Sequence, residues 1–149
     1  MALVVAAAAV LPKLPKRPKK GNFAKRKALT ANEQAMYWRL ADCFPMPDQA
    51  VLAQVSFGAL LRAKGGASRY SFSQKIADFV LMSKGFEVIA VIELDDASHK
   101  GREANDADRD AMLIEAGYKV LRYKRVPDRA QLMEDIASFK APTEMNSTS

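Results

Sequence analysis

The chain has 149 residues and a mass of 16.4 kDa, the usual size of one domain. Apolar residues make up 49% of it and charged residues 27%, a balance typical of a globular protein. One cysteine and one histidine exclude a disulfide framework, a cysteine-based zinc site and histidine-rich metal chemistry. No apolar run approaches the ~20 residues of a membrane helix. We therefore expect a soluble protein of a reducing, cytoplasmic compartment.

The positive charge is concentrated near the N-terminus. Lys and Arg total 23 against 17 acidic residues, but residues 1–27 hold eight of the basic residues and no acid. The other 122 residues therefore carry a net charge of −2. We expect residues 1–27, apolar and then rich in Pro, Lys and Arg, to be a disordered tail that contacts a polyanion. Its basic residues include Lys16, Arg17, Lys19 and Lys20. The alternative is an interfacial membrane anchor at its apolar start.

The next segment, 28–140, predicts a single α/β domain, followed by a small and polar tail at 141–149 that we expect to be disordered. Thr30 and Glu33 form a capping box before a helix that Pro45 ends. Apolar residues alternate with others from 51 to 57, which predicts a strand, and a short helix is expected at 59–63.

The second half of this domain predicts a hairpin, a helix, a strand and a last helix. The hairpin strands span 76–82 and 87–95, joined by a link that contains a glycine. A helix at 105–116 follows, with its buried face on Ala107, Ala111 and Ile114 and its end at Gly117. A strand at 118–123 and a helix at 130–139 complete the order α-β-β-β-α-β-α. This order predicts a mixed β-sheet flanked by helices.

Acidic residues interrupt both strands of the hairpin, Asp78 in the first and Glu93 and Asp95 in the second. They are informative because burying a carboxylate without a partner is costly. A spacing of two places Glu93 and Asp95 on one face. If the turn consists of 84–85 alone, Asp78 faces Val91, and Glu93 is its diagonal neighbour roughly 7–8 Å away.

Three converging carboxylates repel one another unless a divalent cation or a shared proton lies among them, and all-oxygen ligands favour Mg²⁺ or Mn²⁺. The hairpin acids therefore predict a metal site. The alternative is that they face solvent at a sheet edge or pair with Lys75 and Arg122. His99, four residues beyond Asp95, is a candidate ligand, general base or water-positioning group, or else a solvated surface residue.

Two further acids have structural explanations that compete with functional ones. Asp110 borders the packed face of its helix, and we expect it to form a salt bridge with Arg109 or Arg122. Glu33 is the reciprocal partner in the capping box, and the first helix can also turn this carboxylate toward the metal.

Several spaced segments of the domain form a recognisable set. They are Leu29-Thr30 with Glu33, Gln54 to Phe57, Lys75 to Val80, Val91 to His99, Asp106 to Gly117 and Val120 to Arg122. Together they resemble the restriction-endonuclease-like PD-(D/E)XK superfamily, in the branch near the very-short-patch repair endonucleases. Within that branch the match is to a family of uncharacterised bacterial domains, and the resemblance covers about residues 28–139.

The resemblance implies roles for the acids of the hairpin. Asp78 matches the first metal-binding aspartate of the superfamily, and Glu93 matches the acid of the (D/E)xK element. Asp95 stands where that element has its lysine, and an aspartate cannot stabilise developing negative charge. The repair-endonuclease branch also lacks that lysine and uses a nearby histidine. His99 is therefore the natural substitute. Lys75 and Lys100 are alternatives, but Lys75 has the opposite strand parity to Asp78 and should point to the other face.

The expected function is that of a Mg²⁺- or Mn²⁺-dependent endonuclease that cuts DNA, with RNA left open and with His99 acting on the attacking water. Lys75, Arg109 and Arg122 are expected at phosphate groups, and the basic tail adds salt-dependent affinity. Many enzymes that resemble this fold cut duplexes as pairs, so a homodimer is a further expectation. The alternative is a nuclease-fold module that binds nucleic acid but cuts slowly or not at all. The missing lysine and the near-neutral domain favour it.

Overall fold

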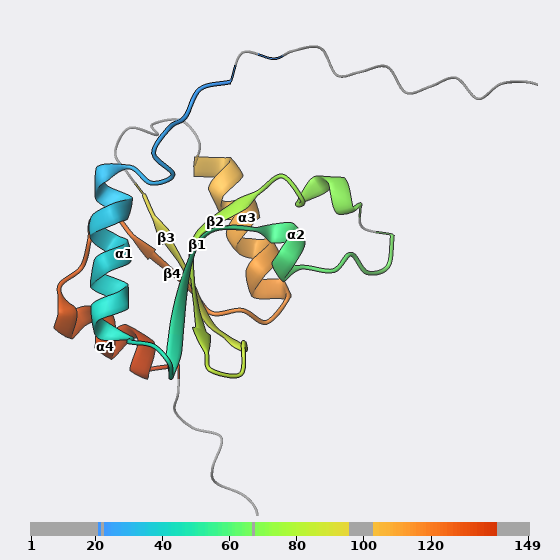
Figure 1. Ribbon diagram of the computed structural model, residues 1–149. Coiled ribbons are helices and arrows are strands. Elements are labelled where there is room, and N and C mark those ends of the chain that lie inside the picture. Colours follow the sequence, from blue (N-terminus) through green and yellow to red (C-terminus); the bar gives the residue numbers. More distant parts are fainter. Residues whose placement is uncertain (1–20, 22, 67, 96–102, 140–149) are drawn as a thin grey trace, which may run out of the picture.

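The computed structural model describes residues 21, 23–66, 68–95 and 103–139, with the backbone alone for 103–107. These residues form one α/β domain built on a four-stranded sheet (Figure 1). The elements in chain order are α1 (Ala31–Cys43), β1 (Gln49–Ser56), α2 (Phe57–Leu60), the 3₁₀ turn η1 (Arg69–Ser71), β2 (Ile76–Ser83), β3 (Val88–Leu94), α3 (Glu103–Glu115), β4 (Val120–Tyr123) and α4 (Arg129–Ala137).

The sheet has the strand order β1-β2-β3-β4, with two antiparallel pairings followed by a parallel one between β3 and β4. Parallel neighbours need a crossover, and α3 provides it. The predicted mixed sheet and the order of its elements are confirmed. None of the helices in the described ranges has the length and apolar character needed to cross a bilayer.

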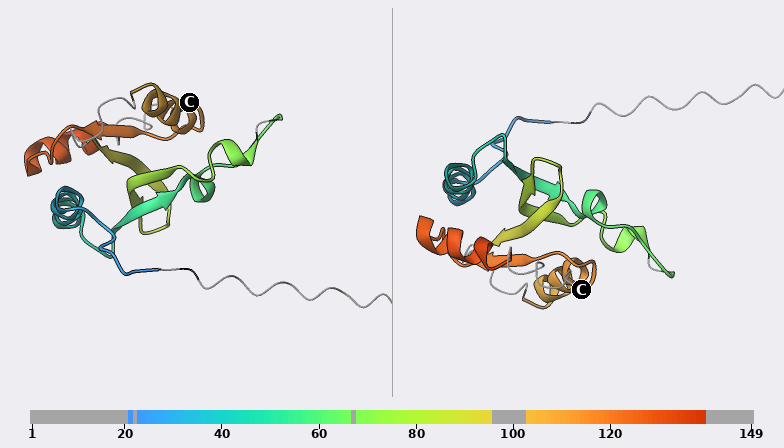
Figure 2. Two further views of the ribbon diagram at one scale, coloured as in Figure 1. Left: turned by 90° about the horizontal axis from the view of Figure 1, so that it is seen from above. Right: turned by 90° about the horizontal axis from the view of Figure 1, so that it is seen from below.

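Helices cover both faces of the sheet, as two views along it show (Figure 2). On one face α1 and α4 pack against alternate strand residues such as Phe79 and Ile92, and on the other α2 and α3 pack against Val80 and Val91. This alternation follows from the two-residue period of a strand. The side chain at Glu93 has the parity of Val91, so it belongs to the α3 face.

The first helix begins as its sequence predicts. The Thr30 hydroxyl accepts a hydrogen bond from the Glu33 N–H at 3.3 Å, and the Glu33 carboxylate accepts one from the Thr30 N–H at 2.6 Å. These two bonds satisfy donors that the first turn of a helix leaves open. Met36 and Leu40 are fully buried on the inner face of α1.

Two predicted details on the α3 face are wrong. Phe57 does not end the first strand but begins α2, which spans 57–60 and not 59–63, because the Ser56 hydroxyl caps the N–H of Gly58 at 3.1 Å. In α3, Ala111 and Ile114 are exposed, whereas Leu113 is completely buried. The helix is rotated from the predicted orientation, because Leu113 and Arg109, one turn before it, contact the sheet. The side chain of Ala107 lies outside the described residues.

The predicted register of the hairpin is also wrong, by two residues. Val91 pairs with Val80 and not with Asp78. The turn has three loop residues, 84–86, with the Phe86 N–H bonded to the Ser83 carbonyl and Phe86 at φ +63°. This longer turn shifts the register by one residue. An irregularity between Leu81 and Met82 shifts it by the second. Phe79 pairs with Ile92. The same register, continued by one residue, places Asp78 directly opposite Glu93.

Candidate functional site

Two carboxylates lie side by side where β2 begins and β3 ends. Asp78 on β2 is half-buried, and its Oδ2 accepts a hydrogen bond from the Leu94 N–H on β3 at 2.9 Å. Glu93 on β3 has only 2% of its surface exposed and is the only polar or charged residue within the described ranges that is fully buried. The corrected register therefore brings these two acids closer than the sequence predicts.

Both carboxyl groups resist ionisation. Burial, together with the nearby charge of Asp78, raises the pKa of Glu93 to about 8, against the opposing effect of Arg109. Burial also raises the pKa of Asp78, and the charge of Glu33 adds to this, while the Leu94 N–H acts in the opposite direction. Glu93 therefore keeps its proton at neutral pH unless a cation or another positive charge binds beside the pair. Strongly perturbed carboxyl groups of this kind are typical of functional sites.

Arg109 on α3 lies over this pair and is fixed from three sides. Its Nη2 lies 3.3 Å from Glu93 Oε2 and donates to the Ile76 carbonyl at 2.5 Å. Its guanidinium also lies over the Phe57 ring, 5.7 Å from the ring centroid. Arg109 thus joins α3 and the start of β2 to the buried glutamate, which holds the Glu93 side chain in place.

Asp95 is paired with an arginine in a neighbouring network. Arg122 on β4 donates from Nε and Nη2 to the two carboxylate oxygens of Asp110, at 3.0 and 2.6 Å, and from Nη1 to Asp95. Burial lowers the pKa of Arg122, but its hydrogen bonds to Asp110 and Asp95 and their negative charges outweigh this effect and leave the pKa above its ordinary value. The salt bridge expected between Asp110 and Arg122 is present. The structure thus brings two of the three predicted carboxylates together and pairs the third with an arginine.

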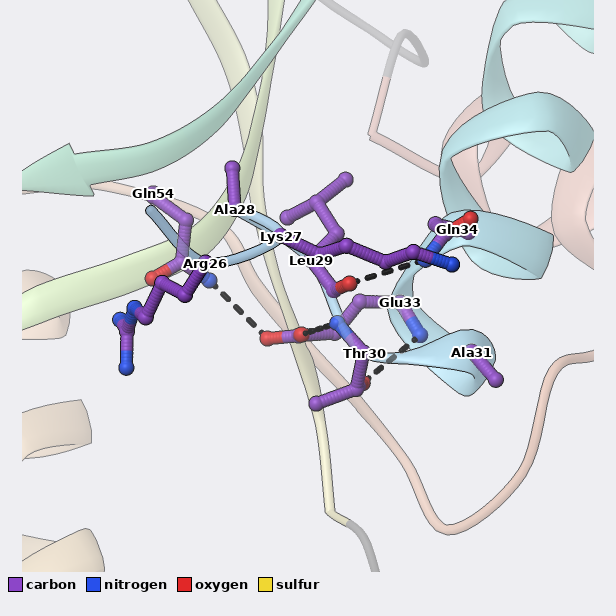
Figure 3. Close-up of a pocket in the computed structure, with 9 residues that line it drawn as sticks. All are labelled: Arg26, Lys27, Ala28, Leu29, Thr30, Ala31, Glu33, Gln34 and Gln54. Atoms are coloured by element: carbon purple, nitrogen blue, oxygen red, sulfur yellow. Dashed lines mark hydrogen bonds between the residues drawn. The ribbon is translucent and has the colours of Figure 1, made fainter. Parts of the chain in front are cut away.

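Glu33 and Gln54 form a second contact beside Asp78. Gln54 Nε2 donates to Glu33 Oε1 at 3.0 Å, at the wall of a pocket of about 460 Å³ that Arg26 and Lys27 also line (Figure 3). Gln54 has φ +56° within β1, at the position that the register places opposite Asp78. Left-handed backbone at a residue other than glycine is strained and re-aims a side chain. Sequence reasoning did not give Gln54 a role. Its signals were a polar side chain between Ala53 and Val55 and its place at the start of one of the segments that carry the family resemblance.

The donor chemistry of the pair fits a hard divalent cation. Mg²⁺ is commonly bound by one or two carboxylates together with waters and substrate phosphates, and does not need an all-protein cage. Asp78 and Glu93 supply such a donor set, and a bound cation would favour the ionised form of both. No group of three histidine, cysteine, aspartate or glutamate side chains in the described part of the chain is arranged to hold a metal. Among the described residues, these two carboxylates are therefore the protein ligands that a cation at this position would have.

Other predicted site residues lie nearby or outside the described part of the chain. Lys75 directly precedes β2, and its carbonyl accepts a hydrogen bond from the Phe57 N–H at 2.9 Å. His99 lies outside the described residues, as do the predicted tail at 141–149 and most of that at 1–27, including Lys16, Arg17, Lys19 and Lys20. Cys43 is buried and forms no disulfide.

The fold and the site together define a mixed α/β domain with a half-buried and a fully buried carboxyl group paired at the open end of its central hairpin. A family model described as "Protein of unknown function (DUF2726)" matches residues 25–139, and the chain belongs to this family. Neither the curated proteins nor the solved structures contain a match.

Proposed function

We propose that this protein is a metal-dependent phosphodiesterase that cuts DNA, with a fold related to the restriction-endonuclease-like PD-(D/E)XK superfamily. The observation that carries the proposal is the pairing of Asp78 with the buried Glu93 across two adjacent strands. A structural role alone does not account for two neighbouring carboxyl groups whose burial raises the pKa of both.

The sheet topology supports the same relationship. The resemblance seen in the sequence implies an acid on each strand of a hairpin, followed by a helix and a parallel strand. β2, β3, α3 and β4 follow that order, and the two acids lie on neighbouring strands.

In this proposal Asp78 and Glu93 hold Mg²⁺ or Mn²⁺. When bound, the cation supplies Lewis-acid stabilisation of the phosphate and lowers the pKa of a coordinated water. The Leu94 N–H orients the Asp78 carboxylate, and Arg109 orients that of Glu93. His99, five residues beyond Leu94, is proposed to accept the proton of the attacking water or to orient it.

Glu33 and Gln54 are proposed to support the site from the side of β1. Their hydrogen bond fixes a third carboxylate close enough to raise the pKa of Asp78, after the larger effect of burial. Negative charge at this position strengthens the attraction of a cation to the pair. Arg26 and Lys27 at the same pocket, and Lys75 beside β2, are proposed to contact the phosphate backbone.

A specific observation favours a second candidate, a module that binds nucleic acid without cutting it. By the resemblance, Asp95 stands where the superfamily has a lysine, and Arg122 binds both Asp95 and Asp110, so its single positive charge is fully used by two carboxylates. The position therefore supplies no positive charge to a developing transition state.

Cleavage of supercoiled plasmid in Mg²⁺ or Mn²⁺ tests the proposal. We expect metal-dependent nicking by the wild type and by Glu134→Gln, which removes an exposed carboxylate on α4. Asp78→Asn and Glu93→Gln should lower the rate at least about a hundredfold, because each removes a charge that holds the cation. DNA binding without nicking in either metal would instead favour the second candidate.

A further inference from the structure

The segment between β1 and β2 is a long projection with a single sign of charge. We call residues 57–66 and 68–75 the basic arm; Figure 2 shows it extending away from the body of the domain. The chain has no acidic residue between Asp48 and Asp78. The cations of this stretch all belong to the arm and are Arg62, Lys64, Arg69 and Lys75. A local excess of positive charge on a near-neutral domain attracts polyanions.

The 3₁₀ turn of the arm displays an aromatic ring. Tyr70 has 89% of its surface exposed, whereas Phe72, two residues later, is only 6% exposed. The turn that holds Tyr70 is ordered by Ser68, whose hydroxyl accepts from the Tyr70 N–H at 3.3 Å and whose carbonyl accepts from the Ser71 hydroxyl at 2.6 Å. The ring is therefore presented to solvent by a defined turn, directly beside Arg69.

The arm is anchored beside the carboxylate pair. Phe57 and Phe72 pack with Leu113 in the core of the α3 face, and the Ser56 hydroxyl donates to the Ser73 carbonyl at 3.0 Å. The Phe57 ring lies beneath Arg109, which contacts Glu93. The inner end of the arm therefore lies at the same end of the sheet as the two acids. A ligand bound along the arm would reach them there.

A second basic segment with an exposed aromatic lies before α1. Phe23 is 94% exposed, and Lys25, Arg26 and Lys27 follow it, all of them exposed. Arg26 and Lys27 line the pocket that contains Glu33. Phe23 and Tyr70 are the two most exposed large apolar or aromatic side chains in the described ranges. Each stands within an acid-free basic stretch close to the candidate site.

We propose that the basic arm binds single-stranded nucleic acid, with its cations on the phosphates and Tyr70 stacked on an unpaired base. Aromatic rings that alternate with cations are the usual means of binding single strands, because every unpaired base offers a π-face that a duplex conceals. The inference that the DNA to be cut has a single-stranded segment next to the scissile bond rests on the proposed function. The binding itself does not.

The residues of the arm fit a nucleic acid better than an anionic membrane. An interfacial surface needs several apolar side chains to enter the acyl boundary together with its cations. The other two aromatic residues of the arm, Phe57 and Phe72, are buried in the domain, which leaves Tyr70 as its only exposed ring.

Fluorescence anisotropy with a labelled oligodeoxythymidine and a matched duplex, in EDTA, tests the binding. Tyr70→Ala should weaken the Kd for the single strand at least about fivefold, the low end of base–aromatic stacking, and change the duplex Kd by less than about twofold. Tyr70→Phe should bind as the wild type does, because it keeps the ring.

The role of the cations is tested by the salt dependence of the same binding. Lys64→Ala with Arg69→Ala should lower the slope of log K against log[salt] by about 1.4. The control is Lys84→Ala with Lys119→Ala, which removes the same charge from two exposed positions, one just after β2 and one just before β4. Both lie at the end of the sheet opposite to the arm, so this double variant should leave the slope unchanged. Equal effects of the two double variants, or equal loss of single strand and duplex in Tyr70→Ala, would overturn the proposal. Arm-dependent binding to anionic vesicles but not to DNA would also overturn it.

Plasmid cleavage separates this proposal from the proposed function. Arm-dependent binding of single strands without metal-dependent nicking would refute the nuclease and leave the arm proposal standing. Nicking with arm variants that bind single strands as the wild type does would refute the arm proposal alone.

Discussion

Substitution of Glu93 by glutamine should stabilise the metal-free protein at neutral pH. Glutamine has the shape of a protonated glutamate and still accepts the hydrogen bond from Arg109. Burial raises the pKa of Glu93 from 4.5 to about 8 in the folded chain, so above pH 4.5 the unfolded chain releases a proton that the folded chain retains. Ionisation of Glu93 therefore favours the unfolded state. The stability that the protonated Glu93 contributes is greatest at low pH and is lost as the pH rises toward 8.

The size of this effect follows from proton linkage. Each pH unit between the two pKa values lowers the free energy of unfolding by up to about 1.4 kcal/mol. From pH ~5 to pH ~7.5 the loss due to Glu93 is about 3 kcal/mol. Glu93→Gln should lack this loss, so the variant should match the wild type near pH ~5 and exceed it by about 3 kcal/mol near pH ~7.5. Asp78 titrates in both proteins and is coupled to Glu93, so the difference between the two proteins reports Glu93 together with that coupling.

Urea unfolding in EDTA, followed by far-ultraviolet circular dichroism across this pH range, measures the difference. Trp38, the only tryptophan, is 69% exposed and would report unfolding poorly by fluorescence. Glu134→Gln, which removes an exposed carboxylate from α4, should follow the wild type at every pH. Parallel pH profiles for wild type and Glu93→Gln, or a less stable variant at neutral pH, would show that burial of Glu93 does not oppose its ionisation.

Other predictions concern packing, capping and metal binding. Leu113→Ala should lower the free energy of unfolding by about 2–5 kcal/mol, because Leu113 is completely buried. Ile114→Ala, at a position 60% exposed, should lower it by less than about 1 kcal/mol. Equal losses in urea unfolding would contradict the observed rotation of α3. Thr30→Ala should lower the free energy of unfolding by about 1 kcal/mol, because it removes the cap of α1. Thr30→Ser keeps a hydroxyl and should retain most of that stability. An unchanged stability of Thr30→Ala would show that the cap is dispensable. Mg²⁺ at a hundredfold excess over its Kd should stabilise the wild type near pH ~7.5 by about 2.7 kcal/mol and leave Asp78→Asn unchanged; an equal gain in both would place the cation elsewhere.

The site itself was only partly accessible from the sequence. The two-residue period of a strand correctly places Glu93 on the face that Val91 shares, and the acids of the hairpin stood out against their apolar neighbours. The contact between Gln54 and Glu33 was not predictable, because it depends on a left-handed residue inside a strand. Nothing in the residue type of Gln54 announces that conformation, which glycine adopts far more readily.

The sequence by itself determined the order of the elements, the capped start of α1 and the mixed character of the sheet. Those features follow from local periodicity and from hydrogen bonds between residues a few positions apart. Only the tertiary structure decided which acids meet. The register that sets Asp78 opposite Glu93 depends on a three-residue turn and a bulge, and the ion pair of Arg122 draws Asp95 to Asp110. Both depend on contacts between distant segments, whose energies a local pattern of residues does not contain.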